Sequence, residues 1–198
     1  MASIAIPVLE WKEVPSQRKK FTRSELERLE ATGLFDGQRL ELLNGDLIDK
    51  MGHNPPHADG IVELTYLLNQ IFRNGRVRVQ VPIELPEPDA NWNQPQPDLA
   101  VTPAGKRYSK GHPAGSDLLL AVEVADSSVR QDTGLKRLLY ARAGVPEYWV
   151  LDIPSRKLLV YRKPEGGEFQ EAVELSDAEF VPYSSNAGVP SLVRDLLP

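Results

Sequence analysis

Two carboxylates inside short apolar runs constrain the fold of this chain more than any other feature. Asp98 opens the run 98–101, and Glu123 stands near the end of the run 118–124. Short apolar runs bounded by loops rich in proline and glycine are typical of buried strands. A carboxylate in such a strand is costly unless it is paired, hydrogen-bonded or bound to a cation. If the two strands are neighbours, the sequence indicates a site for Mg²⁺, because this ion prefers oxygen ligands.

The composition is ordinary for a soluble globular protein, with 41% hydrophobic and 26% charged residues in 198. This length predicts one domain over 21–198, preceded by an extended arm over 1–20. There is no cysteine, which excludes disulfides and thiolate metal sites. No apolar run approaches the about 20 residues of a membrane span, and no secretion signal opens the chain. We therefore expect a cytoplasmic protein that does not associate with membranes.

The net charge of −5 argues against a broad basic surface that coats nucleic acid. It does not exclude a nuclease, because metal-binding carboxylates contribute to the negative total. Positive residues cluster at 18–20, 73–78 and 106–110. Lys106 and Arg107 are the best candidates for phosphate contact because they follow the Asp98 strand, although exposed cations of this kind are most often only solvated.

Local patterns predict the order of the elements. Thr22 and Glu25 form a capping box, and Asn44-Gly45 is a strong hairpin signal. The predicted elements are a helix over 22–33, a hairpin over 39–50, a helix over 57–73, strands over 77–85, 98–101 and 118–124, a helix over 130–143, strands over 148–151, 157–162 and 168–174, and a short helix within 189–197. This order predicts an α/β (α+β) fold with a central mixed sheet flanked by helices. No glycine-rich phosphate loop is present, which argues against a nucleotide-binding fold.

A set of short motifs stands in a fixed order along the chain, each on a predicted element of a particular kind. The motifs are the run 41–45 (ELLNG), His57 at a helix start, Pro97-Asp98-Leu99, Val122-Glu123-Val124, Ser127-Ser128, Asp132, Lys136, Tyr140 and the run 144–152 (GVPEYWVLD). With these motifs the chain resembles the PD-(D/E)xK superfamily, and most closely its Uma2-like (DUF820) branch, over residues 20–165. In the superfamily's motif a lysine stands two places after the second acid, where this chain has Ala125. Similar Uma2-like sequences carry the lysine on the following helix, at the place of Lys136.

The resemblance implies a restriction-endonuclease-like fold with an N-terminal helix and hairpin, and a Mg²⁺-dependent endonuclease that hydrolyses DNA. Mn²⁺ is expected to support the reaction when it is supplied in place of Mg²⁺. Asp98, Glu123 and Glu41 are implied as metal ligands. Lys136 completes the implied catalytic set by orienting water or neutralising charge on the phosphate. By analogy with nucleases that cut both strands, a homodimer is expected.

Several of these residues also have plain structural explanations. Lys136 and Asp132 would form an exposed i,i+4 couple if the helix faced solvent. Glu41 would be a solvent-facing strand residue, His57 a capping residue, and Tyr140 a core residue. His57 and Tyr140 are otherwise expected to contact the substrate, together with Lys106 and Arg107. The alternative function is a non-catalytic module that binds nucleic acid or protein, which Ala125 and the acidic net charge favour.

Overall fold

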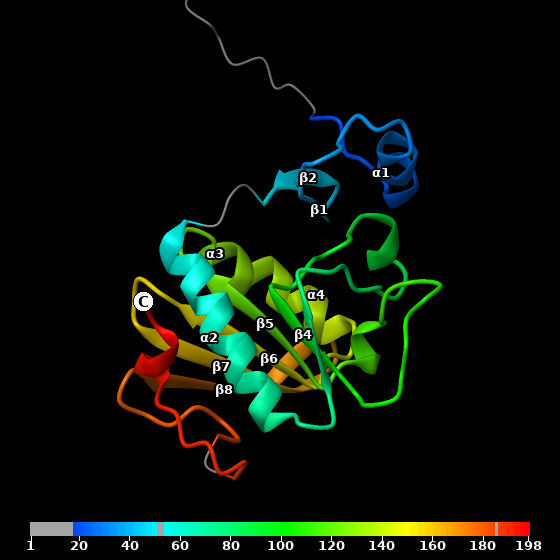
Figure 1. Cartoon of the computed structure of the whole chain (residues 1–198). Coiled ribbons are helices and arrows are strands. Elements are labelled where there is room, and N and C mark those ends of the chain that lie inside the picture. Colours follow the sequence, from blue (N-terminus) through cyan, green and yellow to red (C-terminus); the bar gives the residue numbers. More distant parts are fainter. Residues whose placement is uncertain (1–17, 51–53, 185) are drawn as a thin grey trace, which may run out of the picture.

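The fold contains two sheets, one large and one small (Figure 1). A computed structural model describes residues 18–50, 54–184 and 186–198. Most of the arm predicted over 1–20 therefore lies outside the described residues. The small sheet is the antiparallel hairpin of β1 (Leu40–Leu43) and β2 (Asp46–Asp49). Asn44 and Gly45 both have positive φ at its turn, as the Asn-Gly signal predicts.

The large sheet has six strands in the order β3-β4-β5-β6-β7-β8. The strands are β3 (Arg76–Val79), β4 (Leu99–Thr102), β5 (Leu120–Ala125), β6 (Glu147–Asp152), β7 (Lys157–Glu165) and β8 (Glu168–Ser176). Neighbouring strands are antiparallel except β5 and β6, which are parallel and are joined by a helical crossover. The sheet is thus mixed, and the predicted fold class is confirmed.

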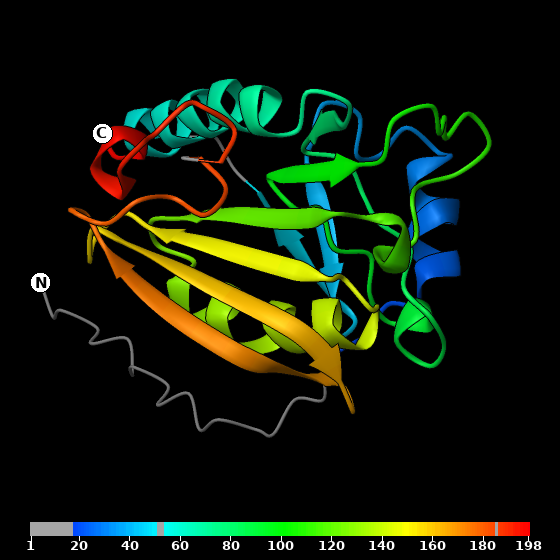
Figure 2. The ribbon, with the colours of Figure 1, turned by 90° about the horizontal axis from the view of Figure 1, so that it is seen from below.

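Helices cover both faces of this sheet (Figure 2). On one face lie α2 (Pro55–Ile71) and the short C-terminal helix η4 (Val193–Leu196), and on the other lies the crossover. The crossover consists of α3 (Val129–Gln131), a wider π-type turn η3 (Asp132–Lys136) and α4 (Arg137–Arg142). α1 (Arg23–Glu30) begins at the predicted capping box of Thr22 and lies beside the hairpin.

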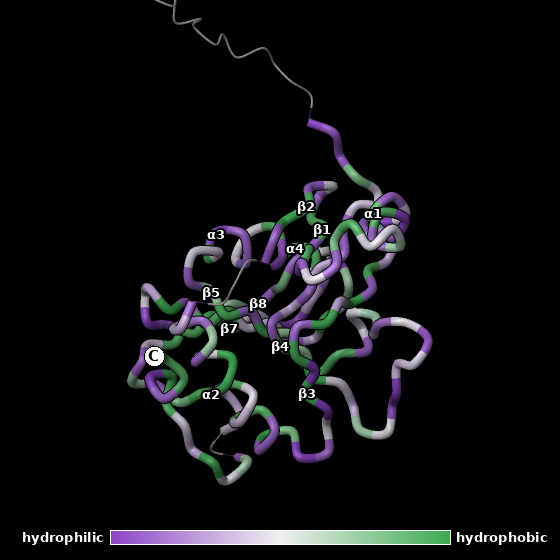
Figure 3. Tube along the Cα trace, turned by 45° about the horizontal axis from the view of Figure 1, so that its top comes forward, coloured by the Kyte–Doolittle hydropathy of each residue, from purple (hydrophilic) through white to green (hydrophobic). Residues whose placement is uncertain are grey.

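The side chains of β5 alternate between two hydrophobic clusters. Val122 and Val124 pack with α2, whereas Ala121 and Ala125 pack with α4. Glu123 lies between these two alanines, so it points toward α4. In Figure 3 hydrophobic residues concentrate in the interior and hydrophilic ones on the outer loops. Glu123 is therefore an ionisable group inside an apolar layer.

α2 and β5 approach each other closely at Gly60. A Cβ atom at Gly60 would lie 2.9 Å from Cγ1 of Val124. Because no other residue lacks a Cβ, glycine is required for this approach. His57 lies about one turn before Gly60 on the same helix. The close contact therefore fixes the height of His57 above the sheet.

Two predicted elements differ from the structure. The strand predicted over 77–85 ends at Val79, because Gln80 has a φ of 52° and Pro82 has no N–H for the ladder. Ile83 and Leu85 are nevertheless buried, so the alternation reflected burial rather than strand pairing. The helix predicted over 130–143 is interrupted by the π-type turn.

No helix in the described part of the chain is long and apolar enough to cross a membrane.

Candidate active site

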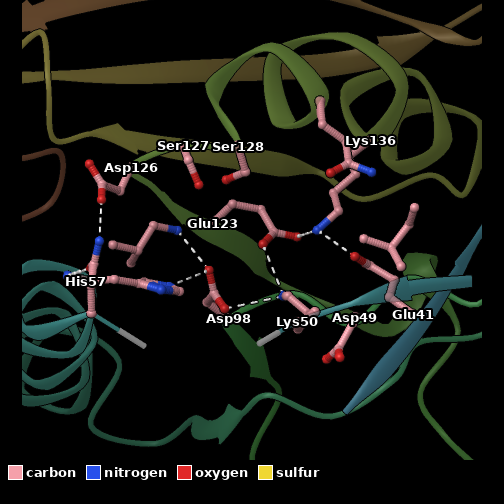
Figure 4. Close-up of a pocket in the computed structure, with 14 residues that line it drawn as sticks. Glu41, Asp49, Lys50, His57, Asp98, Glu123, Asp126, Ser127, Ser128 and Lys136 are labelled. Carbon is pink, nitrogen blue, oxygen red and sulfur yellow. Dashed lines mark hydrogen bonds and ion pairs between the residues drawn. The ribbon is translucent and has the colours of Figure 1, made fainter. Parts of the chain in front are cut away.

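A pocket of about 380 Å³ opens between the hairpin, the start of α2 and the strands β4 and β5 (Figure 4). Five residues predicted for the site line it: Glu41, His57, Asp98, Glu123 and Lys136. They come from two sheets and two helical segments, so only the folded chain brings them together. We use the term acid–lysine cluster for six side chains at this pocket: Glu41, Lys50, Asp98, Glu123, Asp132 and Lys136.

Asp98 immediately precedes β4 and is 2% exposed. Its Oδ2 accepts a hydrogen bond of 2.9 Å from the backbone N–H of Val124 and lies 3.2 Å from Nε2 of His57. Its Oδ1 lies 3.2 Å from Nζ of Lys50. Burial opposes ionisation of Asp98, but the Lys50 ammonium and the Val124 N–H outweigh it and lower its pKa. Asp98 is therefore an ionised carboxylate in a fixed orientation.

Glu123 is the central acid of the cluster and is 1% exposed. Its Oε1 accepts hydrogen bonds from Lys136 Nζ at 3.0 Å and from the Tyr140 hydroxyl at 2.7 Å. Its Oε2 lies 3.6 Å from Nζ of Lys50. Burial raises the pKa of Glu123 to about 8, although the two ammonium groups act in the opposite direction. A divalent cation beside this carboxylate would favour its ionised form.

Lys136 is 2% exposed and is held by acids on three sides. Its Nζ lies 3.0 Å from Glu41 Oε2, 3.0 Å from Glu123 Oε1 and 3.4 Å from Asp132 Oδ1. Burial alone would lower the pKa of Lys136, but attraction by the acids, led by Glu123, raises it well above its usual value. The structure excludes an exposed i,i+4 couple, because Asp132 is also buried.

Glu41 reaches the cluster from the hairpin. It is 1% exposed, which excludes the solvent-facing alternative. Its Oε1 accepts a hydrogen bond of 2.8 Å from the backbone N–H of Gln96, and its Oε2 contacts Lys136. Glu41 thus ties the hairpin both to the loop before Asp98 and to the crossover.

Lys50 was missed by the sequence reasoning. Its Nζ donates to the carbonyl of Gln96 at 2.7 Å and contacts both Asp98 and Glu123. One signal was present: Glu41 pairs with Ile48 in the hairpin, so Lys50, two residues further on, lies on the same face as Glu41. Attraction by the acids, led by Glu123, outweighs burial and raises the pKa of Lys50.

The residues predicted to contact the substrate fall into two groups. His57 lines the pocket, and Tyr140 reaches it through Glu123. Lys106 and Arg107 are exposed in the loop that follows β4, at the opposite end of that strand from Asp98. Lys106 pairs with Asp117 there. The contact of these two cations with phosphate stays a prediction, and the pocket gives it no support.

The oxygen donors at the pocket decide whether a divalent cation fits there. In the described part of the chain, no three His, Asp or Glu side chains form a group that could hold a metal ion. Asp98 Oδ1 and Glu123 Oε2 nevertheless face one common point, which the Lys50 ammonium occupies. Mg²⁺ needs only one or two carboxylates when water and phosphate complete its coordination. The acid–lysine cluster also has four carboxylates against two ammonium groups, a formal excess of two negative charges. The residues therefore fit one divalent ion.

A mixed sheet that carries buried acids and lysines at one pocket is the arrangement expected of a nuclease-like protein. The chain belongs to the Uma2 family, whose model matches residues 23–189 and is described as "Putative restriction endonuclease". The fold is similar to the crystal structure of "a putative nuclease belonging to DUF820" from Anabaena variabilis ATCC 29413. The two chains are 18% identical, with a TM-score of 0.60 over 79% of this chain and 88% of that chain. No curated protein matches this chain. The resemblance inferred from the motifs is thus confirmed.

Proposed function

We propose that this protein is a Mg²⁺-dependent endonuclease that hydrolyses phosphodiester bonds in DNA, with Mn²⁺ as a substitute. One observation carries the proposal. Asp98 immediately precedes β4, and Glu123 lies in the antiparallel neighbour β5. Both acids are buried, and each turns one oxygen toward the same point of the pocket. Burial of two carboxylates at the wall of a pocket is costly, and binding a cation offsets that cost.

Asp98 and Glu123 would hold the ion. Bound Mg²⁺ supplies charge for the developing transition state and lowers the pKa of a bound water. The protein's own groups hold these two acids in place: the Val124 N–H orients Asp98, and the Tyr140 hydroxyl orients Glu123. Such preorganisation avoids reorientation during the reaction.

The other predicted residues have supporting roles in this proposal. Lys136 fixes Glu41 and Glu123 and supplies positive potential near the phosphate, as its ion pairs support. Glu41 stays a predicted ligand of the metal, acting directly or through water. His57 lies beside Asp98 at the pocket wall, where a proton or a hydrogen bond could be given to a phosphate oxygen. We also propose a homodimer, by analogy with nucleases that cut both DNA strands with a two-fold pair of sites.

The test is cleavage of supercoiled plasmid with Mg²⁺ or Mn²⁺, for the wild type, Asp98→Asn and Asp177→Asn. Asp177 is half-exposed and pairs with Arg156 outside the pocket, so it is a matched control for the removal of one charge. We expect the wild type and Asp177→Asn to cut and Asp98→Asn to lose at least about a hundredfold in rate. Equal cutting by Asp98→Asn would refute the proposed site. DNA binding by a wild type that cuts in neither metal would favour the non-catalytic binding module.

A further inference from the structure

Lys50 occupies the point at which the carboxylates of Asp98 and Glu123 converge. We propose that Lys50 is an internal counter-ion that fills the cation position of the metal-free site. The divalent ion must displace its ammonium group, so Lys50 lowers the affinity of the site for the metal. This inference rests on the metal site of the proposed function and adds a role for a residue outside its implied catalytic set.

The distances show why the ammonium and a metal ion exclude each other. Nζ of Lys50 lies 3.2 Å from Asp98 Oδ1 and 3.6 Å from Glu123 Oε2 (Figure 4). A Mg²⁺ ion binds carboxylate oxygen at about 2.0–2.1 Å. An ion placed between these two oxygens would therefore contact Nζ itself, and the two positive charges would repel each other. One of the two cations must leave.

Lys50, rather than Lys136, is the lysine able to leave. The Lys136 side chain is 3% exposed and is surrounded by three carboxylates, whereas the Lys50 side chain is 12% exposed and lines the pocket. The backbone N–H of Lys50 donates to the carbonyl of Arg39 at 2.8 Å, which anchors the main chain. The displacement then involves only the four-carbon side chain, which is flexible.

Charge also explains why the site would keep such a lysine. Without a bound cation, the acid–lysine cluster has a formal excess of negative charge even with both ammonium groups present. Removal of Lys50 would leave Asp98 with no lysine within ion-pair distance among the described residues. The lysine thus holds the metal-free site together, and the metal ion must compete with it.

The experiment is titration of the metal-free full chain with Mn²⁺ by isothermal calorimetry, at one pH and without DNA. Lys50→Met removes the charge and keeps an unbranched side chain, and Lys50→Gln is a second, polar variant. Lys157→Met is the matched control, because Lys157 is half-exposed, pairs with Glu174 and does not line the pocket. Melting temperatures with EDTA and with Mn²⁺ are measured for all four proteins.

We expect both Lys50 variants to bind Mn²⁺ at least about tenfold more tightly than the wild type, since a charge that competes for the site is gone. Lys157→Met should bind as the wild type does. With EDTA the Lys50 variants should melt at a lower temperature, and Mn²⁺ should raise their melting temperature more than that of the wild type. If folded Lys50 variants bind Mn²⁺ as tightly as the wild type or more weakly, the counter-ion proposal is overturned and the proposed function is unaffected. Absence of Mn²⁺ binding in every protein overturns both.

Discussion

Lys136→Met tests whether the acid–lysine cluster stabilises the fold. The substitution removes an ammonium that lies 3.0 Å from two buried carboxylates and 3.4 Å from a third. Removing one partner of a buried ion pair costs about 3–5 kcal/mol, because the other charge stays buried and unpaired. Glu123, whose pKa is already about 8, can take up a proton and relieve part of this cost. We therefore expect the free energy of unfolding to fall by an amount near the lower end of this range, about 3 kcal/mol at pH 8.

The assay is urea unfolding followed by circular dichroism in EDTA, at pH 8 and at pH 5. A loss of about 3 kcal/mol corresponds to a melting temperature lower by about 6–12 °C in a chain of this size. The loss should shrink at pH 5, because Glu123, with a pKa of about 8, is protonated there and needs no counter-charge. Lys157→Met, which removes a half-exposed lysine from a surface ion pair, should change the free energy of unfolding by less than about 0.5 kcal/mol.

The double variant Glu123→Gln/Lys136→Met gives the sharper comparison. If Glu123 and Lys136 stabilise each other, the free energy of unfolding falls less in the double variant than the sum of the falls in the two single variants. The difference should be at least about 1 kcal/mol. A loss below about 1 kcal/mol in Lys136→Met, or strictly additive losses, would refute the reasoning. In that case Lys136 would be an incidental buried lysine rather than the counter-charge of the three acids.

The remaining predictions concern packing and pH. Gly60→Ala should destabilise the fold despite the better helix propensity of alanine, because its Cβ would lie 2.9 Å from Cγ1 of Val124. A Cβ atom at Gly134 would have no heavy atom within 4 Å, so Gly134→Ala should be neutral or stabilising. Thermal unfolding of both variants checks this. The folded-state pKa of Glu123 is raised from 4.5 to about 8, so its contribution is present at low pH and lost as the pH rises through 8. Metal-free wild type should therefore lose stability between pH 4.5 and about pH 8 in urea unfolding, and Glu123→Gln should lose less; equal slopes would contradict the raised pKa.

The acids were predictable from sequence because their neighbours are apolar. Asp98 begins one run and Glu123 interrupts another, and both runs are otherwise typical of buried strands, where a carboxylate demands an explanation. The Asn-Gly turn and the capping box also predicted local structure, since each is determined by residues within a few positions. These features need no knowledge of how distant segments pack.

Lys50 could not be assigned in the same way. It contacts Asp98 across 48 positions of sequence, through a hairpin that pairs with neither β4 nor β5. The hairpin register places Lys50 on the same face as Glu41, but no local pattern predicts that this face of the hairpin contacts Asp98. The π-type turn was also missed, because a helical period of 3.6 does not distinguish a regular helix from one with a wider turn. Long-range docking and local irregularity thus limited the prediction of the site.

The missing lysine two places after Glu123 has a structural explanation. Ala125 lies on the same face of β5 as Glu123, and it is completely buried in the cluster that contains Leu139 and Tyr140. A lysine at this position would have to displace α4, whose packing already fills the space. The crossover instead delivers Asp132, Lys136 and Tyr140 at intervals of four residues, and the last two both contact Oε1 of Glu123. The lysine on the helix and the alanine on the strand therefore depend on each other, because the helix that supplies the ammonium requires a small residue beneath it.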